Sequence, residues 1–223
     1  MRNRASERGG SIIEFALISM TLFPLLLGTG ALGVNMIRVQ QTTQLAREAG
    51  EMFARGVDFS KPGNLSVLVQ IGSSLGLSAT QGSGTAVVIL TALTYVDKQA
   101  CALAGAVDTN GNPANCTNFG QWVFAQRQVV GNPSIRTSNT GSPLTTGPTG
   151  VSMDPVSGKI AVNDYVSQAG AVARFSSINP YSSVNGVVSG LPAGQYIYLA
   201  EAATSTLSMS VYGGTATYAF AMF

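Results

Sequence analysis

The chain has 223 residues, of which 10% are charged and none is histidine. Because imidazole is the commonest general base and a frequent metal ligand, its absence argues against an enzyme, a bound metal or a cofactor. The net charge of +2 resides in residues 1–9. Residues 10–223 carry nine basic and nine acidic side chains, so no basic patch is left to bind nucleic acid.

The first predicted element is a long apolar helix at residues 15–37. Its 23 residues carry no formal charge and read FALISMTLFPLLLGTGALGVNMI. A helix of that length spans about 34 Å, which is enough to cross a hydrocarbon core of about 30 Å. Pro24 and three glycines lie inside it, and membrane helices tolerate both residue types better than soluble helices do. We therefore expect residues 10–37 to form one transmembrane helix in contact with membrane lipid.

The charged residues that flank the apolar segment predict its orientation. Three arginines precede it: Arg2, Arg4 and Arg8. After it come three basic residues, Arg38, Arg47 and Arg55, and the last two are interleaved with the acidic residues Glu48 and Glu51. Since an excess of positive charge on a short flank stays in the cytoplasm, we expect the N-terminus to be cytoplasmic and residues 57–223 to lie outside.

A carboxylate at the start of the apolar segment argues against an ordinary secretory signal peptide. Such a peptide would be cut after its apolar region, at a small-x-small site. Here the apolar run is longer than usual and Glu14 stands at its entrance, where an ionised group at the edge of a bilayer is costly unless it is paired.

The residues around that carboxylate form a motif: Arg8-Gly9-Gly10-Ser11-Ile12-Ile13-Glu14-Phe15-Ala16-Leu17. The motif resembles the prepilin-peptidase site of class III signal peptides, in which a short basic leader ends in glycine and the fifth mature residue is Glu. The resemblance implies a cut between Gly9 and Gly10. Glu14 then becomes the fifth mature residue and Phe15 takes the aromatic place. The cut removes the leader, residues 1–9, and keeps the helix as an anchor.

The longer run GGSIIEFALISMTLFPLLLG resembles the N-terminus of the TadE-like proteins of tight-adherence (Flp-type) pilus systems. Their marks are a Gly-small-x-x-x-Glu-Phe-Ala-Leu run, a proline in the apolar segment and a polar helix that continues out of the membrane. The likeness covers about residues 8–55. It implies a minor pilin or pseudopilin of the bacterial inner membrane or of a surface pilus, with Glu14 and Pro24 used in assembly. The partners implied are a prepilin peptidase, a TadF-like sister protein, the major pilin and the assembly platform.

Two roles are open for the Glu14 carboxylate. The cut would expose an amine on Gly10, and amine and carboxylate could neutralise each other within one chain or between neighbouring subunits. Pairing between subunits would set the axial register of the assembly. Alternatively, Glu14 is a carboxylate at the beginning of a helix, where the helix dipole favours negative charge.

Beyond the membrane the helix is expected to continue through residues 38–56. Its apolar side chains recur on one side: Leu45, Ala49, Met52 and Phe53. Gly56 is a stop signal. A single helix from Ser11 to Arg55 would be about 68 Å long.

The rest of the chain, residues 57–223, is predicted to be a mainly antiparallel α+β domain. We expect a short helix at 64–77 with Asn64 as its N-cap and Gly76 near its end. Runs of β-branched and aromatic residues predict strands at 85–96 and 119–130, which could pair with each other. Residues 131–158 are rich in Gly, Pro, Ser and Thr and are expected to form a flexible loop.

The C-terminal part of this domain leaves two alternatives open. Residues 159–174 fit either a helix or a strand. Alternation of apolar residues from Gly194 onward favours strands, although 195–206 could also be helical.

Cys101 and Cys116 lie fifteen positions apart on either side of a turn-rich segment. In an outer compartment two such cysteines are expected to form a disulfide, with two free buried thiols as the alternative.

Two motif matches carry no weight. Residues 28–33 fit G-x-G-x-x-G but lie in the apolar helix rather than after a strand, so they do not predict a dinucleotide site. Residues 108–112 only faintly resemble the opening of a calcium loop, because position 12 is Phe119 rather than Glu.

Two other function classes remain. One is an anchored extracytoplasmic module for binding or adhesion. The weaker one is an anchored hydrolase that pairs a serine with Lys61, Lys98 or Lys159, which no motif supports.

Overall fold

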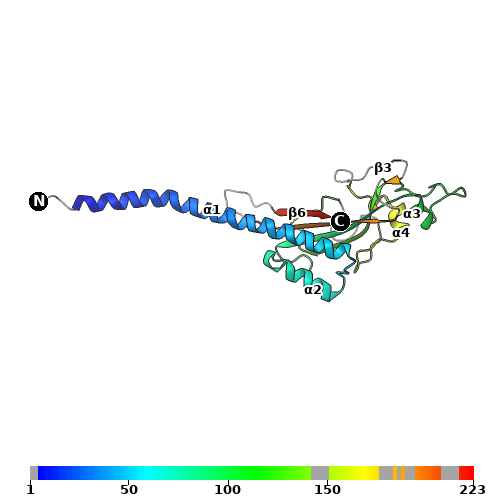
Figure 1. The fold of residues 1–223 in the computed structure, drawn as a ribbon, viewed down its shortest axis with the longest axis horizontal. Helices are drawn as coiled ribbons and strands as arrows, with labels where there is room; N and C mark the ends of the chain where they lie inside the picture. The colour runs from blue at the N-terminus through cyan, green and yellow to red at the C-terminus, as the bar shows by residue number, and fades with distance from the viewer. Residues whose placement is uncertain (1–4, 142–150, 176–182, 185–186, 189–193, 207–215) are drawn as a thin grey trace.

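The structure is a computed structural model, and it describes residues 5–141, 151–175, 183–184, 187–188, 194–206 and 216–223. A long helix extends from one end of a domain that the rest of the chain forms (Figure 1). This helix, α1, spans Ala5–Ala54, and a four-stranded antiparallel sheet follows it in the chain. The α+β class predicted from the sequence, with a long N-terminal helix and a mainly antiparallel sheet, is confirmed.

Helix α1 has an exposed half and a buried half. From Gly10 to Ile37 its apolar side chains are uncovered; Phe15, for example, is 72% exposed. In the second half Leu45, Ala49 and Phe53 are at most 3% exposed and pack on the sheet. The apolar stripe predicted for this half is therefore confirmed as the face of the helix that contacts the domain.

The sheet has the order β2-β1-β5-β6, and every neighbouring pair is antiparallel. Its strands are β1 (Ala86–Tyr95), β2 (Trp122–Gly131), β5 (Tyr196–Thr204) and β6 (Thr217–Met222). All ten residues of β1 are buried, because it lies between two strands and both of its faces are covered. The two predicted strands, and their pairing, are confirmed. Of the alternatives for 195–206, the strand is the one observed, while residues 207–215 lie outside the described residues.

Alternation along β1 assigns one set of side chains to each face of the sheet. Val88, Leu90 and Ala92 lie in the core beneath α1, whereas Val87 and Ile89 lie in a separate cluster. Small residues let the helix come close: a Cβ added at Gly50 would lie 3.0 Å from the Cβ of Ala200. We call these two faces the helix face and the outer face.

A second helix, α2 (Pro62–Ile71), and a 3-10 turn, η1 (Ser73–Leu75), lie beside the end of α1 (Figure 1). The predicted N-cap is wrong, because the helix begins at Pro62, whose ring suits the first helical position. The side chain of Asn64 instead donates a hydrogen bond to the Asp58 carbonyl at 2.8 Å. Gly76, with φ +75°, ends this region as predicted.

The end of the domain far from the N-terminus carries short elements (Figure 1). They are α3 (Lys98–Leu103), α4 (Val162–Ser167), η2 (Ala169–Ala171), β3 (Ser183–Val184) and β4 (Val187–Val188). The stretch 159–174, left open by the sequence, thus contains helices. The predicted disulfide between Cys101 and Cys116 is present, with Cα atoms 5.7 Å apart.

Residues 131–158, expected to form a loop, begin with the last residue of β2. Residues 132–141 then cross the outer face, and residues 151–160 return along the edge of β2. The carbonyl of Gly158 accepts a hydrogen bond from the amide of Arg127 at 2.8 Å. Residues 142–150, in the middle of the predicted loop, lie outside the described residues, and the flexibility of the loop stays a prediction.

Candidate functional site

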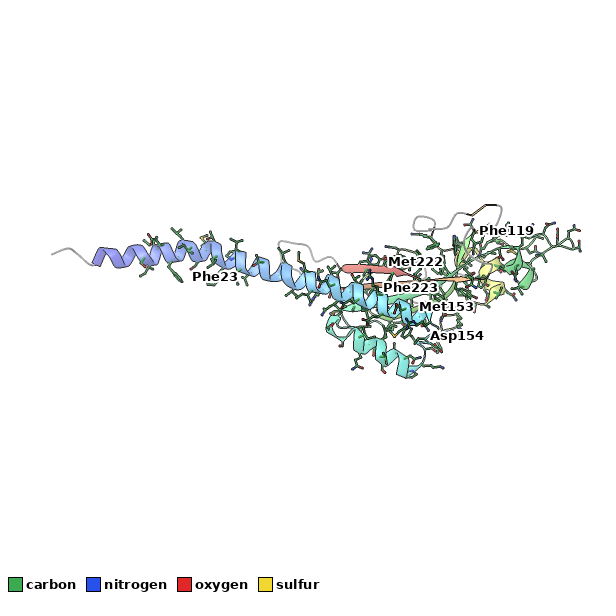
Figure 2. The ribbon with its side chains drawn as sticks, in the orientation of Figure 1. Phe23, Phe119, Met153, Asp154, Met222 and Phe223 are labelled. Atoms are coloured by element: carbon green, nitrogen blue, oxygen red, sulfur yellow. A yellow bond between two sulfur atoms is a disulfide. The ribbon has the colours of Figure 1, made fainter. Side chains whose placement is uncertain are left out.

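The exposed half of α1 is the first candidate site. Within the part of the chain that the structure describes, α1 is the one helix long and apolar enough to cross a membrane. Its most apolar 18-residue window has a mean hydropathy of 1.9, and none of that window is buried. Side chains such as Phe23 project freely from the ribbon (Figure 2). The helix is a candidate single membrane span.

Every residue that the sequence predicts for processing or assembly lies on this one helix. Gly9 and Gly10 are inside α1, and Glu14 follows Gly10 by four residues, which is about one helical turn. Pro24 also lies inside α1, ten residues beyond Glu14. The structure therefore brings Gly10 and Glu14 to the same side of the helix and places Pro24 farther along.

Glu14 is available to a partner. Among the residues whose side chains the structure describes, none forms an ion pair or a hydrogen bond with this carboxylate. The residues next to it are equally open: Ile13 is 63% exposed and Phe15 is 72% exposed. A carboxylate at the beginning of the open apolar segment of α1, nine residues after the first residue of the helix, can meet a positive group on a second molecule.

A second site, which was not among the residues predicted from the sequence, is a buried ion pair on the outer face. Arg127 on β2 and Glu201 on β5 approach to 3.6 Å, and their side chains are 1% and 2% exposed. The guanidinium also donates to the Thr91 hydroxyl at 3.1 Å, to the Thr140 hydroxyl at 2.7 Å and to the Gly141 carbonyl at 2.8 Å. Arg127 is thus bonded to the segment that follows β2 as well as to the sheet.

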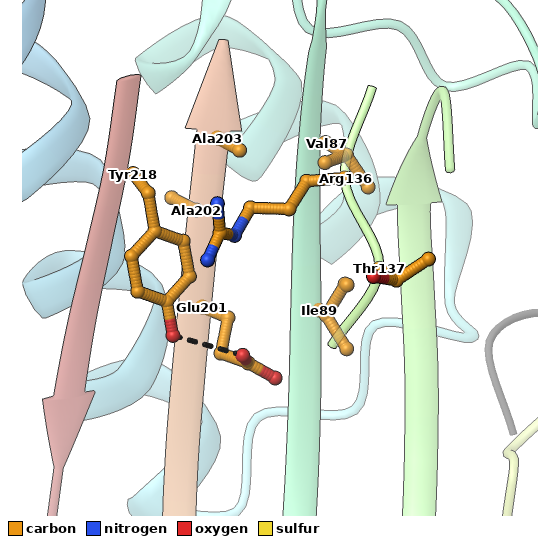
Figure 3. A pocket seen from close by; sticks show the side chains of 8 residues that line it. All are labelled: Val87, Ile89, Arg136, Thr137, Glu201, Ala202, Ala203 and Tyr218. Atoms are coloured by element: carbon orange, nitrogen blue, oxygen red, sulfur yellow. Dashed lines mark hydrogen bonds between the residues drawn. The ribbon is translucent and has the colours of Figure 1, made fainter. Parts of the chain in front are cut away.

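Glu201 is satisfied from the same segment. Its carboxylate accepts hydrogen bonds from the Ser138 hydroxyl, from the Asn139 amide at 2.8 Å and from the Tyr218 hydroxyl at 2.9 Å. Figure 3 shows the Tyr218 bond and the Arg136 side chain reaching over the tyrosine ring. The Arg136 guanidinium lies 4.0 Å from the centre of that ring, a cation–π contact.

Burial shapes the protonation of this cluster. Loss of water around Arg127 lowers its pKa to about 10, opposed by the charge of Glu201, so the guanidinium stays protonated at neutral pH. Burial, with Glu201 next, raises the pKa of Tyr218, which keeps its hydroxyl as a donor. Because Arg127 and Glu201 hydrogen-bond to residues 138–141 and Arg136 packs on Tyr218, the cluster fastens residues 136–141 to the sheet.

A signal for this pair is present in the sequence. Arg127 and Glu201 each stand within an otherwise uncharged strand, in WVFAQRQVVG and YIYLAEAAT. Charged residues are almost never fully buried unless they are paired, so one isolated charge in each of two buried strands predicts a partnership. The sequence does not say that these two strands flank the same neighbour.

The Asp108 side chain stabilises the turn in which it lies. Its carboxylate accepts hydrogen bonds from the amides of Asn110 at 2.9 Å and Asn112 at 2.8 Å. These bonds lower the pKa of Asp108, with the Asn112 amide contributing most. Within the described ranges, no cluster of three or more acidic or cysteine side chains is placed to hold a metal ion.

Comparisons of the chain with protein-family models, with curated proteins and with solved structures give no match.

Proposed function

We propose that the protein is a structural subunit, a TadE-like minor pilin or pseudopilin of a tight-adherence (type IV-related) pilus or secretion machine. One observation carries the proposal: a helix of 50 residues has an open apolar half with Glu14 at its beginning and a second half packed on the domain. Such a helix can leave the bilayer for a bundle of similar helices without unfolding, because its backbone hydrogen bonds are internal.

Processing supplies a positive group for Glu14, which has no ion-pair partner among the residues whose side chains the structure describes. A prepilin peptidase cuts between Gly9 and Gly10 and leaves an amine on Gly10. The Glu14 carboxylate of an arriving subunit then pairs with that amine on a neighbour. In an apolar surrounding this attraction is several times stronger than in water, so an axially misplaced subunit is rejected. Glu14 acts here as a positioning residue for assembly.

The remaining parts of the proposal follow from the charge distribution. The arginine-rich leader stays in the cytoplasm and the domain of residues 57–223 lies outside, so the protein is anchored in the bacterial inner membrane or carried into a surface pilus. Its partners are the prepilin peptidase, the major pilin, a TadF-like protein and the assembly platform.

The proposal is tested by intact mass of the protein extracted from membranes of cells with and without the prepilin peptidase. We expect a chain that begins at Gly10 only when the peptidase is present, and a Gly9→Val variant that keeps its leader in both strains. If the leader remains in both strains, or if the cut falls after the apolar segment, the pilin assignment is wrong.

Assembly is tested separately with Glu14→Val. This variant should be cut normally and yet fail to co-purify with pilus components. Glu48→Val is the matched control, because Glu48 lies on the same helix with an exposed side chain but beyond the apolar segment. Equal recovery of both variants with the pilus would remove Glu14 from assembly.

A membrane-anchored binding or adhesion module is the second candidate function. It is favoured by an open cavity on the helix face of the sheet, at the far end of the domain from the membrane helix. The two functions are compatible, since a pilus subunit can also carry a ligand site.

A further inference from the structure

An open cavity of about 250 Å³ lies on the helix face, where α1 has ended but the sheet continues. Its floor comes from the small residues Ala92 on β1 and Ala125 on β2. One wall is α4 and the other is the start of β5. Known sites for drug-sized ligands measure roughly 300–1,000 Å³, so this cavity suits a single ring rather than a long chain.

Three of the seven tyrosines of the chain line this cavity: Tyr165, Tyr196 and Tyr198. Tyr198 is held by an edge-to-face contact with Phe53, with ring centres 5.4 Å apart, and its own centre is 6.3 Å from that of Tyr196. Tyr196 is 42% exposed although it is large and aromatic. Tyrosine offers a rigid apolar face and a polar hydroxyl at little entropic cost, which is why it recurs in binding surfaces.

The polar groups of the cavity are few and are positioned by the backbone. The Gln126 side-chain amide is fixed by a hydrogen bond of 2.7 Å to the Ser157 carbonyl. Lys159 lies opposite Gln126 in a β-bridge, so both side chains project to the same side of the sheet. Lys159 is the one charged side chain among the residues that line the cavity.

This combination selects among ligand classes. A flat apolar molecule would displace water from the exposed Lys159 ammonium and from the tyrosine hydroxyls without replacing those hydrogen bonds. A cationic ligand, which tyrosine faces could otherwise attract, is disfavoured by Lys159, the one charged residue of the lining, while the Asp97 carboxylate acts on Tyr165 from outside the lining. A sugar ring fits both requirements, because it has an apolar C–H face for the tyrosine rings and hydroxyls around its edge. A carboxylate on the sugar would pair with Lys159.

We propose that this cavity binds one pyranose ring of an acidic saccharide, a uronic-acid unit. Tyr196 and Tyr198 contact the C–H face of the ring, Gln126 and the Tyr165 hydroxyl bond its hydroxyls, and Lys159 pairs with its carboxylate. Burial raises the pKa of Tyr165 to about 12, so its hydroxyl remains a donor at neutral pH. The inference does not rest on the pilin function, because the site is remote from Gly9 and Glu14.

The test uses the full chain in detergent micelles, with methyl glucuronide and methyl glucoside as probes and saturation-transfer NMR as the readout. We expect both sugars to bind, with the glucuronide bound several-fold more tightly. Tyr196→Ala should weaken both at least tenfold, while Tyr196→Phe, which keeps the ring, should retain binding. Phe220→Ala is the control, since Phe220 is similarly exposed, at 37%, and lies on the edge strand β6.

The carboxylate is tested with Lys159→Gln. This variant should bind the two sugars equally, whereas Lys61→Gln, which removes an exposed lysine that does not line the cavity, should keep the preference. No saturation transfer to either sugar at ten-millimolar concentration, or transfer that Tyr196→Ala leaves unchanged, overturns the saccharide site. Equal binding of the two sugars by the unaltered protein overturns the assignment to an acidic saccharide. Tryptophan fluorescence from the buried Trp122 confirms that each variant is folded.

Discussion

Glu201→Ala is the perturbation whose effect the structure defines most sharply. It deletes the partner of Arg127, whose pKa of about 10 keeps it charged at neutral pH in a site where its side chain is 1% exposed. Removing one member of a buried ion pair leaves an uncompensated charge, which costs about 3–5 kcal/mol. The substitution also removes the hydrogen-bond acceptor of the Asn139 amide and of the Tyr218 hydroxyl, so we expect the upper part of that range.

The assay is guanidinium unfolding and thermal melting of the full chain in detergent, followed by tryptophan fluorescence. Trp122 is the single tryptophan and lies 5.0 Å from the Phe175 ring in the domain core, so its emission reports loss of that packing. For a domain of this size each kcal/mol shifts the melting temperature by about 2–4 °C, so a loss of about 4–5 kcal/mol predicts a drop of about 8–20 °C.

A double variant separates the charge from the packing. Arg127→Met with Glu201→Leu removes both charges, and it should be more stable than Glu201→Ala alone, because the unpaired cation is gone. A loss below about 1 kcal/mol for Glu201→Ala, or a double variant less stable than that single variant, would refute the reasoning.

Three further predictions concern stability and titration of the domain. Replacing Cys101 and Cys116 by serine should lower the free energy of unfolding by about 3 kcal/mol in the chain-entropy model, measured by guanidinium unfolding against the oxidised native protein. Gly158→Ala should cost more than Gly105→Ala, although both glycines have φ +68°, because a Cβ at Gly158 would lie 1.9 Å from a β2 carbonyl oxygen while Gly105 faces open space. The left-handed backbone alone costs about 1–2 kcal/mol, so equal melting temperatures would contradict the clash. Tyr165 should ionise near pH 12 in absorbance titration at 295 nm, assigned with Tyr165→Phe. Because the unfolded side chain ionises near pH 10, the fold should lose stability as the pH rises above about 10.

The elements with strong local patterns were predictable. The length of the uncharged apolar segment predicts the first half of α1. Leu45, Ala49 and Phe53 recur at helical spacing, which predicts the face of the second half that packs on the sheet. The strand β1 follows from a dense β-branched run that is fully buried. The disulfide follows from two cysteines in a domain that the sequence predicts to lie outside the cytoplasm.

What the sequence could not give depends on relations between distant residues. Arg127 and Glu201 meet because both β2 and β5 pair with β1. The order of strands in the sheet cannot be predicted from the sequence of either strand. The cavity depends on where α1 stops relative to the sheet, which brings Tyr165 and Tyr196 together across about thirty residues of chain. The N-cap of α2 was misplaced because proline at the first helical position outweighs asparagine two residues later.

Because α1 is continuous, the domain and the open half of the helix are joined without a flexible linker. The helix passes from its open half to its packed half without a loop, and at the junction the Arg38 guanidinium donates to the Ser205 carbonyl at 2.7 Å. One residue inserted between these halves would turn the whole domain by about 100° around the helix axis and lift it by about 1.5 Å. Seven inserted residues would return it to within about 20° of its first heading. The number of residues between the open half and the packed half of α1 therefore determines the direction in which the domain faces.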